Sequence, residues 1–253
     1  QIGKITAIEM SAFYKDIRDL LALQSIRYES EKYGPSNYAI YMNKDYGNVK
    51  GYTFSFTKRY DPVSKTSAFV DYTYQVTEGN SVNSGSFYYN ALSGEQEEKR
   101  IVPLAWDQRH ILNTNLSVGD PRNWNVGVIS KLSSGWPYTP NVPDANYVPQ
   151  PNSGRKPWQW RVDMRVHKNF KIGNFNYLFF MKVYNLLDRR NERYVFNDTG
   201  RAGYTYVYQS TQETQGFKNH YGEAGVHEWS EYQVRPQYYT SPRSINIGFS
   251  VDF

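Results

Sequence analysis

Hydrophobic and polar residues alternate one by one along much of this chain. The alternation is clearest in the last ten residues, 244–253, which read SINIGFSVDF and place the large apolar side chains on one face. A period of two is the spacing of a β-strand with one apolar and one polar face. No long segment shows the 3.6-residue period of an amphipathic helix, so the pattern predicts an all-β fold.

The same alternation recurs along the chain, clearly in some segments and less cleanly before residue 30. It predicts nine strands, and turns between successive strands make them antiparallel. The expected strands are 2–14, 18–30, 38–60, 66–78, 100–118, 124–134, 157–170, 175–197 and 242–253.

The connections between these strands are of two kinds, and the two kinds alternate. Short turns at one end and long loops at the other are typical of outer-membrane β-barrels. A connection as long as 198–241 also predicts a role, such as covering the mouth of the barrel or meeting a partner. The short turns are expected at 15–17, 61–65, 119–123 and 171–174, and the long stretches at 31–37, 79–99, 135–156 and 198–241.

Aromatic residues make up 17% of the chain, which contains 24 Tyr, 13 Phe and 6 Trp. Several lie beside an expected short turn or at the C-terminus, where they would form one girdle at a membrane interface. The alternative is that Tyr and Phe favour strand ends for reasons of propensity alone. The expected girdle residues are Phe13, Tyr14, Tyr60, Trp124, Phe170, Phe175 and Phe253.

The expected order of turns predicts an incomplete barrel. If the short turns are periplasmic, the last strand ends in the periplasm and the first of nine strands begins on the outer side. Single-chain bacterial barrels have an even number of strands and both ends in the periplasm. We therefore expect a fragment whose leader peptide and first strands lie upstream.

Three landmarks, in this order, resemble those of the TonB-dependent outer-membrane receptors. They are PLAWDQRH at 103–110, SGWPYTP at 134–140 and NLLDRRN at 185–191. The last resembles the family's NLFDKxY stretch, with Leu187 where Phe is usual and Asn191 in place of an aromatic residue. The terminal Phe253 resembles the signal of the outer-membrane assembly machinery. The details are more similar to receptors of the Bacteroidetes and related phyla than to enterobacterial siderophore receptors.

This resemblance implies a transmembrane antiparallel β-barrel in the cell outer membrane of a Gram-negative-type bacterium. Residues 1–253 would be the C-terminal portion, the last nine of about 22 strands, and barrels this wide are plugged. The N-terminal plug and the TonB box would lie upstream. The implied activity is import of a scarce, bulky ligand, either a metal chelate, a cobamide or an oligosaccharide. The implied partners are outer-membrane lipid and the TonB complex acting through the plug, and a surface lipoprotein lid is a further candidate.

The charge distribution and the motifs of the chain argue against several other classes of function. The net charge is +5, but the basic residues are scattered with no run of five like charges, so we expect no nucleic-acid partner. The absence of cysteine excludes disulfides and thiolate chemistry. No phosphate-binding loop, GxSxG elbow or close Ser/His/Asp set is present. We therefore expect neither an enzyme nor a bound cofactor.

One row of polar side chains is the main candidate for function. Arg161, Asp163, Arg165 and His167 alternate with apolar residues and would face the lumen. Neighbouring opposite charges in this row suit salt bridges between the wall and the plug, together with hydration. Direct contact with the ligand is the alternative.

The long loops carry two further sets of candidates. Aromatic residues could stack on a sugar or an aromatic chelate, or could pack the loops together; they are Trp136, Tyr138, Tyr204, Tyr206 and Trp229. His220, Glu223 and His227 could converge on a metal if their loop folded suitably. The HEWSE stretch lacks the second His of a zinc-protease motif, so a polar loop without metal is the simpler expectation.

Two other readings of the whole chain stay open at this point. One is an outer-membrane barrel that serves as an adhesin or as a docking platform for a surface lipoprotein. The other is a soluble all-β carbohydrate-binding protein, which the many Tyr and Trp residues would suit. A soluble sheet would have to cover the apolar face of the last strand.

Overall fold

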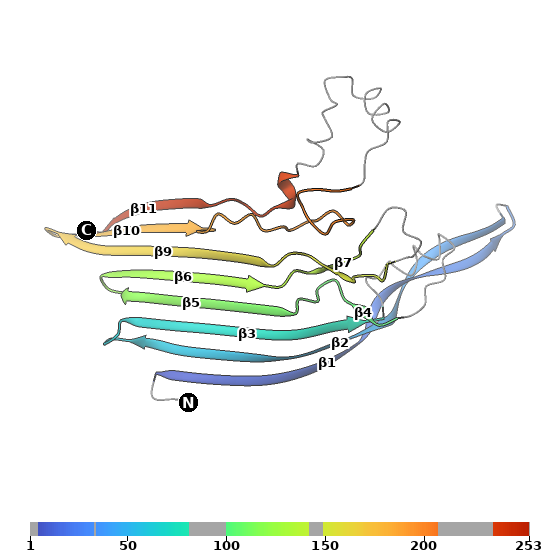
Figure 1. Ribbon diagram of the computed structural model, residues 1–253, viewed down its shortest axis with the longest axis horizontal. Coiled ribbons are helices and arrows are strands. Elements are labelled where there is room, and N and C mark those ends of the chain that lie inside the picture. Colours follow the sequence, from blue (N-terminus) through green and yellow to red (C-terminus); the bar gives the residue numbers. More distant parts are fainter. Residues whose placement is uncertain (1–4, 33, 81–99, 142–148, 207–234, 253) are drawn as a thin grey trace, which may run out of the picture.

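The computed structural model is one large antiparallel β-sheet, and it describes residues 5–32, 34–80, 100–141, 149–206 and 235–252 (Figure 1). Within these ranges, long strands neighbouring in sequence are also neighbours in the sheet. They are β1 (Thr6–Ser30), β2 (Gly34–Asp61), β3 (Thr66–Gly79), β5 (His110–Asp120), β6 (Trp124–Ser133), β9 (Gln159–Ile172), β10 (Phe175–Tyr184) and β11 (Ser244–Asp252).

Three short strands and one helical turn complete the described structure. Strand β4 (Val102–Pro103) extends the main sheet beside β3. Strands β7 (Pro137–Tyr138) and β8 (Gly154–Arg155) pair with each other, and Pro236–Tyr238 forms a 3₁₀ turn. Among the described residues, none of the helices has the length and apolarity needed to span a membrane.

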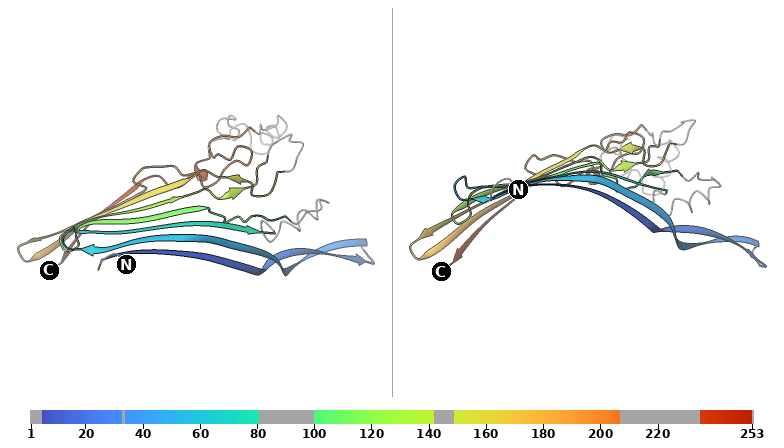
Figure 2. Two further views of the ribbon diagram at one scale, coloured as in Figure 1. Left: turned by 60° about the horizontal axis from the view of Figure 1, so that its bottom comes forward. Right: turned by 90° about the horizontal axis from the view of Figure 1, so that it is seen from below.

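The two ends of the sheet differ, as the connection lengths predict. The β2–β3, β5–β6 and β9–β10 turns lie at one end, and the long connections lie at the other (Figure 1). The long loop expected at 31–37 is wrong, because β2 begins at Gly34 and only a short turn separates it from β1. We call these the turn end and the loop end. The sheet is curved along its width (Figure 2).

The turn expected at 15–17 does not exist. Lys15 and Ile17 pair with Val49 and Gly47, so the two strands expected at 2–14 and 18–30 form the single strand β1. A β-bulge shifts the register between Ile17 and Leu20, and Asp19 adopts a φ of +60° there. A bulge interrupts the alternation of side chains while the strand continues to pair, so the sequence pattern resembles a turn.

The expected start on the outer side is also wrong. Because 6–30 is one strand, eight long strands are present in the described ranges, and the ninth member of the sheet is the short β4. Strand β1 therefore begins at the turn end, where β11 also finishes (Figure 1). The strand-parity argument does not hold for this sheet.

Two further expected strands are shorter than the pattern suggested. In 100–118, only 102–103 and the part from His110 onward are strand, because 104–109 turns away and buries Leu104 and Asp107. In 175–197, strand β10 ends at Tyr184, and Asn185 follows with a φ of +54°. A residue in the left-handed region interrupts the extended conformation, and unlike β1 at the Asp19 bulge, β10 does not resume beyond Asn185.

The register of the sheet collects the alternating side chains into one continuous apolar face. One row crosses six strands from β3 to β11 through directly paired residues. It consists of Ala68, Leu116, Val128, Met164, Val183 and Ile245. The next strand positions add Ile247 and Phe249, which are 67% and 57% exposed. An exposed apolar surface of this extent marks a site that meets a membrane or another protein.

The opposite face is mainly polar. A directly paired row on this polar face crosses β2, β3, β5, β6 and β9; it consists of Ser55, Asp71, Asn113, Lys131 and Arg161. Ser55 donates a 2.6 Å hydrogen bond to Asp71. The sheet therefore separates two environments, one apolar and one wet.

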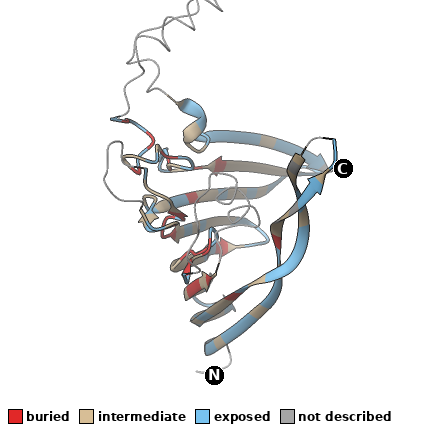
Figure 3. Cartoon of the chain, turned by 90° about the vertical axis from the view of Figure 1, so that its right-hand side faces the viewer, coloured by how far each residue is buried: buried red, intermediate tan, exposed pale blue. Residues whose placement is uncertain are grey.

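Buried residues gather at the loop end rather than in the middle of the sheet (Figure 3). Leu104 is 2% exposed, and its side chain packs where Gly47 and Gly79 leave room for it. Most strand residues are exposed or half-buried. The small core thus anchors the outer connections to the strand ends and does not fill a sandwich.

Candidate functional site

The apolar face has an aromatic rim near the loop end. The rings of Tyr52 and Tyr74 are 5.3 Å apart, Tyr74 and His110 are 5.1 Å apart, and His110 and Trp158 are 5.5 Å apart. Tyr72 shares a 2.8 Å hydrogen bond with Nδ1 of His110. Rings with a polar edge suit a membrane interface, where one side is apolar and the other wet.

A second aromatic rim lies near the turn end. Phe170 and Tyr177 stack with their ring centroids 5.3 Å apart, and Tyr177 lies 5.6 Å from Phe249. Trp124 lies at the same turn end of the sheet, where it pairs with Lys168. Trp124 and Phe170 therefore lie where the predicted girdle needs them.

Tyr60 lies next to the β2–β3 turn, and Phe175 pairs with Ile172 beside the β9–β10 turn, so both also lie at the turn end. Two other predicted girdle residues do not. Phe13 and Tyr14 pair with Gly51 and Lys50 inside the long strand β1, because the expected turn beside them does not exist. Phe253 lies outside the described residues.

The height between the rims matches a membrane. Trp160 lies on the apolar face, two positions from Trp158 of the loop-end rim. Along β9 it is ten positions from Phe170, which is about 33 Å at ~3.3 Å per residue. At the usual strand tilt of about 40° this gives a height of about 25 Å, close to the apolar band of outer-membrane barrels.

The predicted polar row lies on one face, but its members have different roles. Arg161 donates to Asp163 at 2.9 Å, and Asp163 also accepts a 2.8 Å hydrogen bond from the backbone N–H of Asn185. The guanidinium of Arg161 lies 5.9 Å from the ring centroid of Tyr184. This pair therefore holds the end of β10 against β9.

The other two members of the row lie toward the turn end. His167 Nε2 is 3.2 Å from the carbonyl oxygen of Pro121. Arg165 pairs in register with Lys182 on one side and Gly127 on the other. Within the described ranges, Arg165 makes no hydrogen bond or ion pair and is exposed on the polar face.

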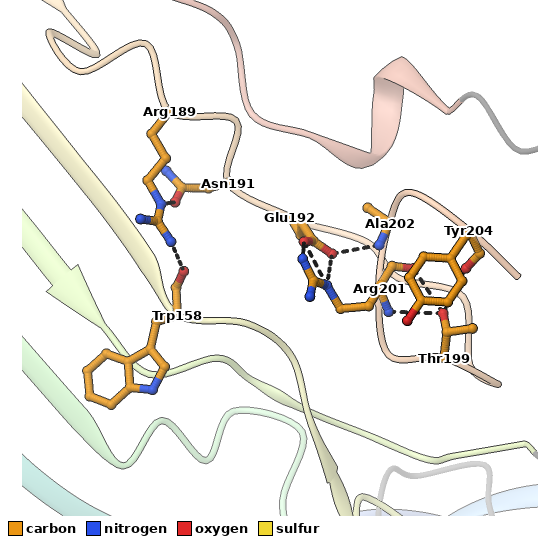
Figure 4. A network of polar contacts seen from close by, with 8 residues as sticks. All are labelled: Trp158, Arg189, Asn191, Glu192, Thr199, Arg201, Ala202 and Tyr204. Carbon is orange, nitrogen blue, oxygen red and sulfur yellow. Dashed lines mark hydrogen bonds and ion pairs between the residues drawn. The ribbon is translucent and has the colours of Figure 1, made fainter.

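An ion pair orders the loop after β10 (Figure 4). Glu192 accepts hydrogen bonds from Arg201 at 2.8 and 3.0 Å and from the backbone N–H of Ala202 at 2.6 Å. These contacts with Glu192 raise the pKa of Arg201 above its ordinary value. Thr199 closes the same turn by donating to the carbonyl oxygen of Tyr204 at 2.8 Å.

The aromatic loop candidates divide into packed and exposed residues. Tyr204 and Tyr206 form an edge-to-face pair 5.7 Å apart, and Tyr206 is 66% exposed. The Tyr138 ring packs on Gly154 and Gly200, neither of which has room for a Cβ. Burial, with a smaller effect of Asp198, raises the pKa of Tyr138. Trp136 is 37% exposed.

Four predicted candidates lie outside the described residues. They are the aromatic Trp229 and the metal candidates His220, Glu223 and His227. In the part of the chain that the structure describes, three or more His, Asp or Glu side chains do not converge as a metal ligand set.

Sequence reasoning missed a fully buried carboxylate at the loop end. Asp107 accepts a 2.7 Å hydrogen bond from the backbone N–H of Thr77 and a 2.8 Å bond from Nε of Arg109, and it also pairs with Arg155. The WDQR stretch signals the pairing with Arg109, two residues away. Arg155 is 48 residues distant, and only the tertiary structure brings it there.

The NLLDRRN stretch forms a second cluster of long-range hydrogen bonds. Asn191 bonds both the N–H and the carbonyl oxygen of Trp160, each at 2.9 Å. Asp188 accepts a 2.8 Å bond from the N–H of Arg243, and so ties the loop to the start of β11. The Asn at 191, unusual for the landmark, therefore caps the loop end of β9.

The chain matches neither a family model nor a curated protein. Among solved structures it is similar to the outer membrane transporter YddB from Escherichia coli, with 13% identity over 78% of this chain and 28% of that one, and a TM-score of 0.55. It is also similar to the closed form of the ferric-catecholate import receptor Fiu from E. coli K12, with 15% identity over 79% and 23% of the two chains, and a TM-score of 0.46.

The likeness to YddB identifies the fold. The sheet has the fold of part of an outer-membrane transporter, which confirms the all-β, antiparallel fold class and agrees with the resemblance seen in the sequence landmarks. The chain spans about a quarter of the length of both solved structures.

Proposed function

We propose that residues 1–253 are the C-terminal portion of the barrel of an outer-membrane transport receptor. One observation carries this proposal: a continuous apolar face, bounded by two aromatic rims about 25 Å apart, backs onto a polar face. Lipid suits the first face, and a watery lumen suits the second. The cell outer membrane of a Gram-negative-type bacterium is the location that provides both.

The transported cargo that we propose is scarce and bulky, such as a metal chelate, a cobamide or an oligosaccharide. The landmarks shared with TonB-dependent receptors support this class, as do exposed aromatic residues such as Trp136 and Tyr206 in the outer connections. Energy would come from the TonB complex, acting through an upstream plug. The polar side chains at the loop end bond one another in structural networks, which favours transport over catalysis.

The soluble carbohydrate-binding alternative accounts poorly for the apolar face. In such a protein a second layer would cover Ile245, Ile247 and Phe249, but all three are more than half exposed in the described structure. Burial of a large apolar residue is worth about 1.5–3 kcal/mol, so a soluble fold would not leave a whole row exposed.

A docking platform is a second candidate, favoured by the β1–β2 hairpin. Beyond the bulge, Leu20–Ser30 pairs with Gly34–Asp45 as a two-stranded ribbon that projects past the loop end of the sheet (Figure 1). Tyr28, Tyr38 and Tyr41 are exposed on it. A surface lipoprotein that acts as a lid is the partner we would test against this ribbon.

The orientation is tested by placing a charge on each face of β11. We expect Phe249→Arg to impair assembly of the full-length protein by about 2–4 kcal/mol, the depth-dependent cost of Arg near the bilayer midplane. The matched control is Ser250→Arg, one residue away on the polar face. Folded protein in outer membranes is measured by its altered gel mobility without heating. Equal assembly of both variants would contradict the orientation.

The transport activity is tested with the full-length gene. Uptake of labelled ferric chelates, cobalamin and oligosaccharides is compared between cells with the gene, without it, and without TonB. The proposal requires at least one probe whose uptake is lost in both deletions. Uptake that is independent of TonB for every probe, together with retention of a lipoprotein by the barrel, would favour the docking alternative.

A further inference from the structure

At the turn end, the β9–β10 hairpin extends past the neighbouring β5–β6 turn (Figure 1). Strand β9 pairs with β6 only as far as Lys168, opposite Trp124, but it pairs with β10 as far as Ile172. The edge of β9 beyond Asn169 is therefore unpaired on the side of β6, and a step forms between the hairpin and the turn. An unpaired strand edge presents backbone donors and acceptors to whatever lies beside it.

This step contains a hollow of about 470 Å³, which we call the turn-end hollow. Hydrogen bonds fix one of its walls. The N–H of Asn169 donates to the carbonyl oxygen of Asn123 at 2.6 Å, and the side chain of Asn169 donates to the carbonyl oxygen of Arg122 at 3.0 Å. The lining includes Arg122, Asn123, Asn169, Phe170, Lys171 and Tyr177.

Positive charge in the turn-end hollow is not balanced. Arg122 and Lys171 are exposed, and within the described ranges neither side chain makes a hydrogen bond or an ion pair. The described lining residues include no carboxylate. Asp120 lies outside the lining, and one of its oxygens accepts a 3.0 Å hydrogen bond from the backbone N–H of Arg122. The hollow therefore suits an anion.

A third cation reaches the hollow from the apolar face. Lys168 lies on that face, directly paired with Trp124 on one side and Phe179 on the other. Its Nζ donates a 2.6 Å hydrogen bond to Oδ1 of Asn123, which belongs to the lining. A lysine on a lipid-facing wall lays its apolar stem along the wall and brings its ammonium to the level of the headgroups. Lys168 therefore adds positive charge where the hollow meets the apolar face.

The other side of the hollow is aromatic and apolar. The stacked rings of Phe170 and Tyr177 belong to residues that line it, and they lie 6.3 and 5.6 Å from the ring of Phe249. Phe249 is 57% exposed. An anion that carries hydrocarbon chains can use both sides of the hollow, whereas an inorganic anion would leave the rings uncovered.

We propose that the turn-end hollow binds the headgroup of an anionic phospholipid. The phosphate accepts charge-assisted hydrogen bonds from Arg122 and Lys171, and the acyl chains cover Phe170 and Tyr177. The ammonium of Lys168 adds to the attraction, as basic residues do near anionic lipid. A zwitterionic phospholipid carries its own cation, which these three residues repel. This inference rests on the proposed function, because it needs the apolar face to meet the bilayer.

Mass spectrometry of intact lipid complexes tests the site. The full-length protein in detergent is titrated with phosphatidylglycerol, which is anionic, or with phosphatidylcholine of the same acyl chains. We expect phosphatidylglycerol to bind at least about tenfold more tightly, since about fivefold is expected for each cation near the headgroup. Equal affinity for the two lipids would overturn the inference.

Charge removal locates the site. We expect Arg122→Gln and Lys171→Gln each to weaken binding of phosphatidylglycerol by about fivefold and to leave phosphatidylcholine unchanged. Arg122→Lys keeps the charge and should restore most of the affinity. The control is Arg190→Gln, which removes the same charge at an exposed position of the loop end. Gel mobility without heating checks that each variant is folded. An unchanged affinity in both folded glutamine variants would overturn the inference.

Competition separates a lipid site from a site for a soluble anion. Bound phosphatidylglycerol is challenged with inorganic phosphate or glycerol 3-phosphate, each at the same concentration as the lipid. We expect neither to displace it, because neither can cover Phe170 and Tyr177. Displacement by either would assign the hollow to a soluble anion and overturn the inference.

The failure of this inference differs from the failure of the proposed function. If Phe249→Arg impairs assembly while the two lipids bind equally, the orientation stands and only the lipid site is refuted. If Phe249→Arg and Ser250→Arg assemble equally, the orientation itself is refuted, and the lipid site with it.

Discussion

The turn end and the loop end of this sheet are held by different kinds of contact. At the turn end, Asp61 accepts hydrogen bonds from the N–H groups of Val63 and Ser64, at 3.1 and 3.2 Å, and Asp120 accepts one from Arg122. At the loop end, Asp107 joins Thr77 and Arg155, which lie 30 and 48 residues away.

This difference indicates where the sheet can tolerate change. The hydrogen bonds of Asp61 and Asp120 are exposed and local, so each of these turns can form before the sheet does. Loop-end contacts are buried and distant in sequence, so they form only when the strands are already in register. We therefore expect substitutions at the loop end to cost more than equivalent substitutions at the turn end.

The largest expected effect is that of Asp107→Asn. Removing the charge leaves Arg109 and Arg155 without their common carboxylate, and breaking a buried ion pair costs about 3–5 kcal/mol. Both arginines are about a third exposed, which places the expected loss at the lower end of this range. This loss is measured as a change in the free energy of unfolding in urea, with the full-length protein refolded in lipid vesicles. Asp120→Asn is the turn-end control, and an equal loss in both variants would remove the distinction between the ends.

A smaller loss is expected for Asn185→Ala. Asn185 has a φ of +54°, and its side chain bonds Arg189 and the carbonyl oxygen of Ser241 at 3.1 Å. Loss of these bonds, together with strain, predicts about 2–3 kcal/mol. Asn185→Gly, which accepts the backbone angle, isolates the hydrogen bonds. If the glycine variant were as stable as the wild type, the bonds would contribute nothing.

Gly173→Ala probes the turn end. Gly173 has a φ of +59°, and a Cβ there would meet nothing within 4 Å. The expected cost is therefore only the backbone penalty of about 1–2 kcal/mol. Asn tolerates this region better than Ala, so Gly173→Asn should recover part of the loss. A cost as large as that of Asp107→Asn would show that the turn end is not the tolerant one.

The smallest expected effect is a pH dependence at Asp61. Hydrogen bonds lower its pKa, chiefly one from the Ser64 side chain and then the backbone bonds from Val63 and Ser64. A carboxyl whose pKa is lower in the folded state contributes stability above its unfolded pKa of about 3.8 and loses it as the pH falls through the folded pKa. The difference in unfolding free energy between wild type and Asp61→Asn should therefore shrink below about pH 4. A difference that stays constant from pH 7 to pH 3 would contradict the contribution of this charge.

The sequence predicted the features that depend on a few neighbouring residues. Alternation over ten residues is enough to identify β11, and DPVSK and GDPRN identify their turns. The same reasoning failed at 15–17, because a bulge and a turn both interrupt the alternation. It failed again at 104–109, where Leu104 and Asp107 leave the strand to fill the core at the loop end.

For the candidate site too, the sequence predicted which residues share a face but not which residues they contact. The period of two is enough to place four polar residues on one face, namely Arg161, Asp163, Arg165 and His167. The register between β9 and β10 decides their contacts. It lets Asp163 accept a hydrogen bond from the N–H of Asn185, and it sets Arg165 opposite Lys182.

By itself, the amino-acid sequence determined the two faces of each strand, the positions of most short turns and the all-β class, because each depends on residues within one strand or turn. The tertiary structure alone decided the end at which β1 begins, the partners of Asp107 and the placement of the Phe180 ring over Gly248. Each of these depends on how strands far apart in the chain align, and an error of one residue in register moves every side chain to the other face.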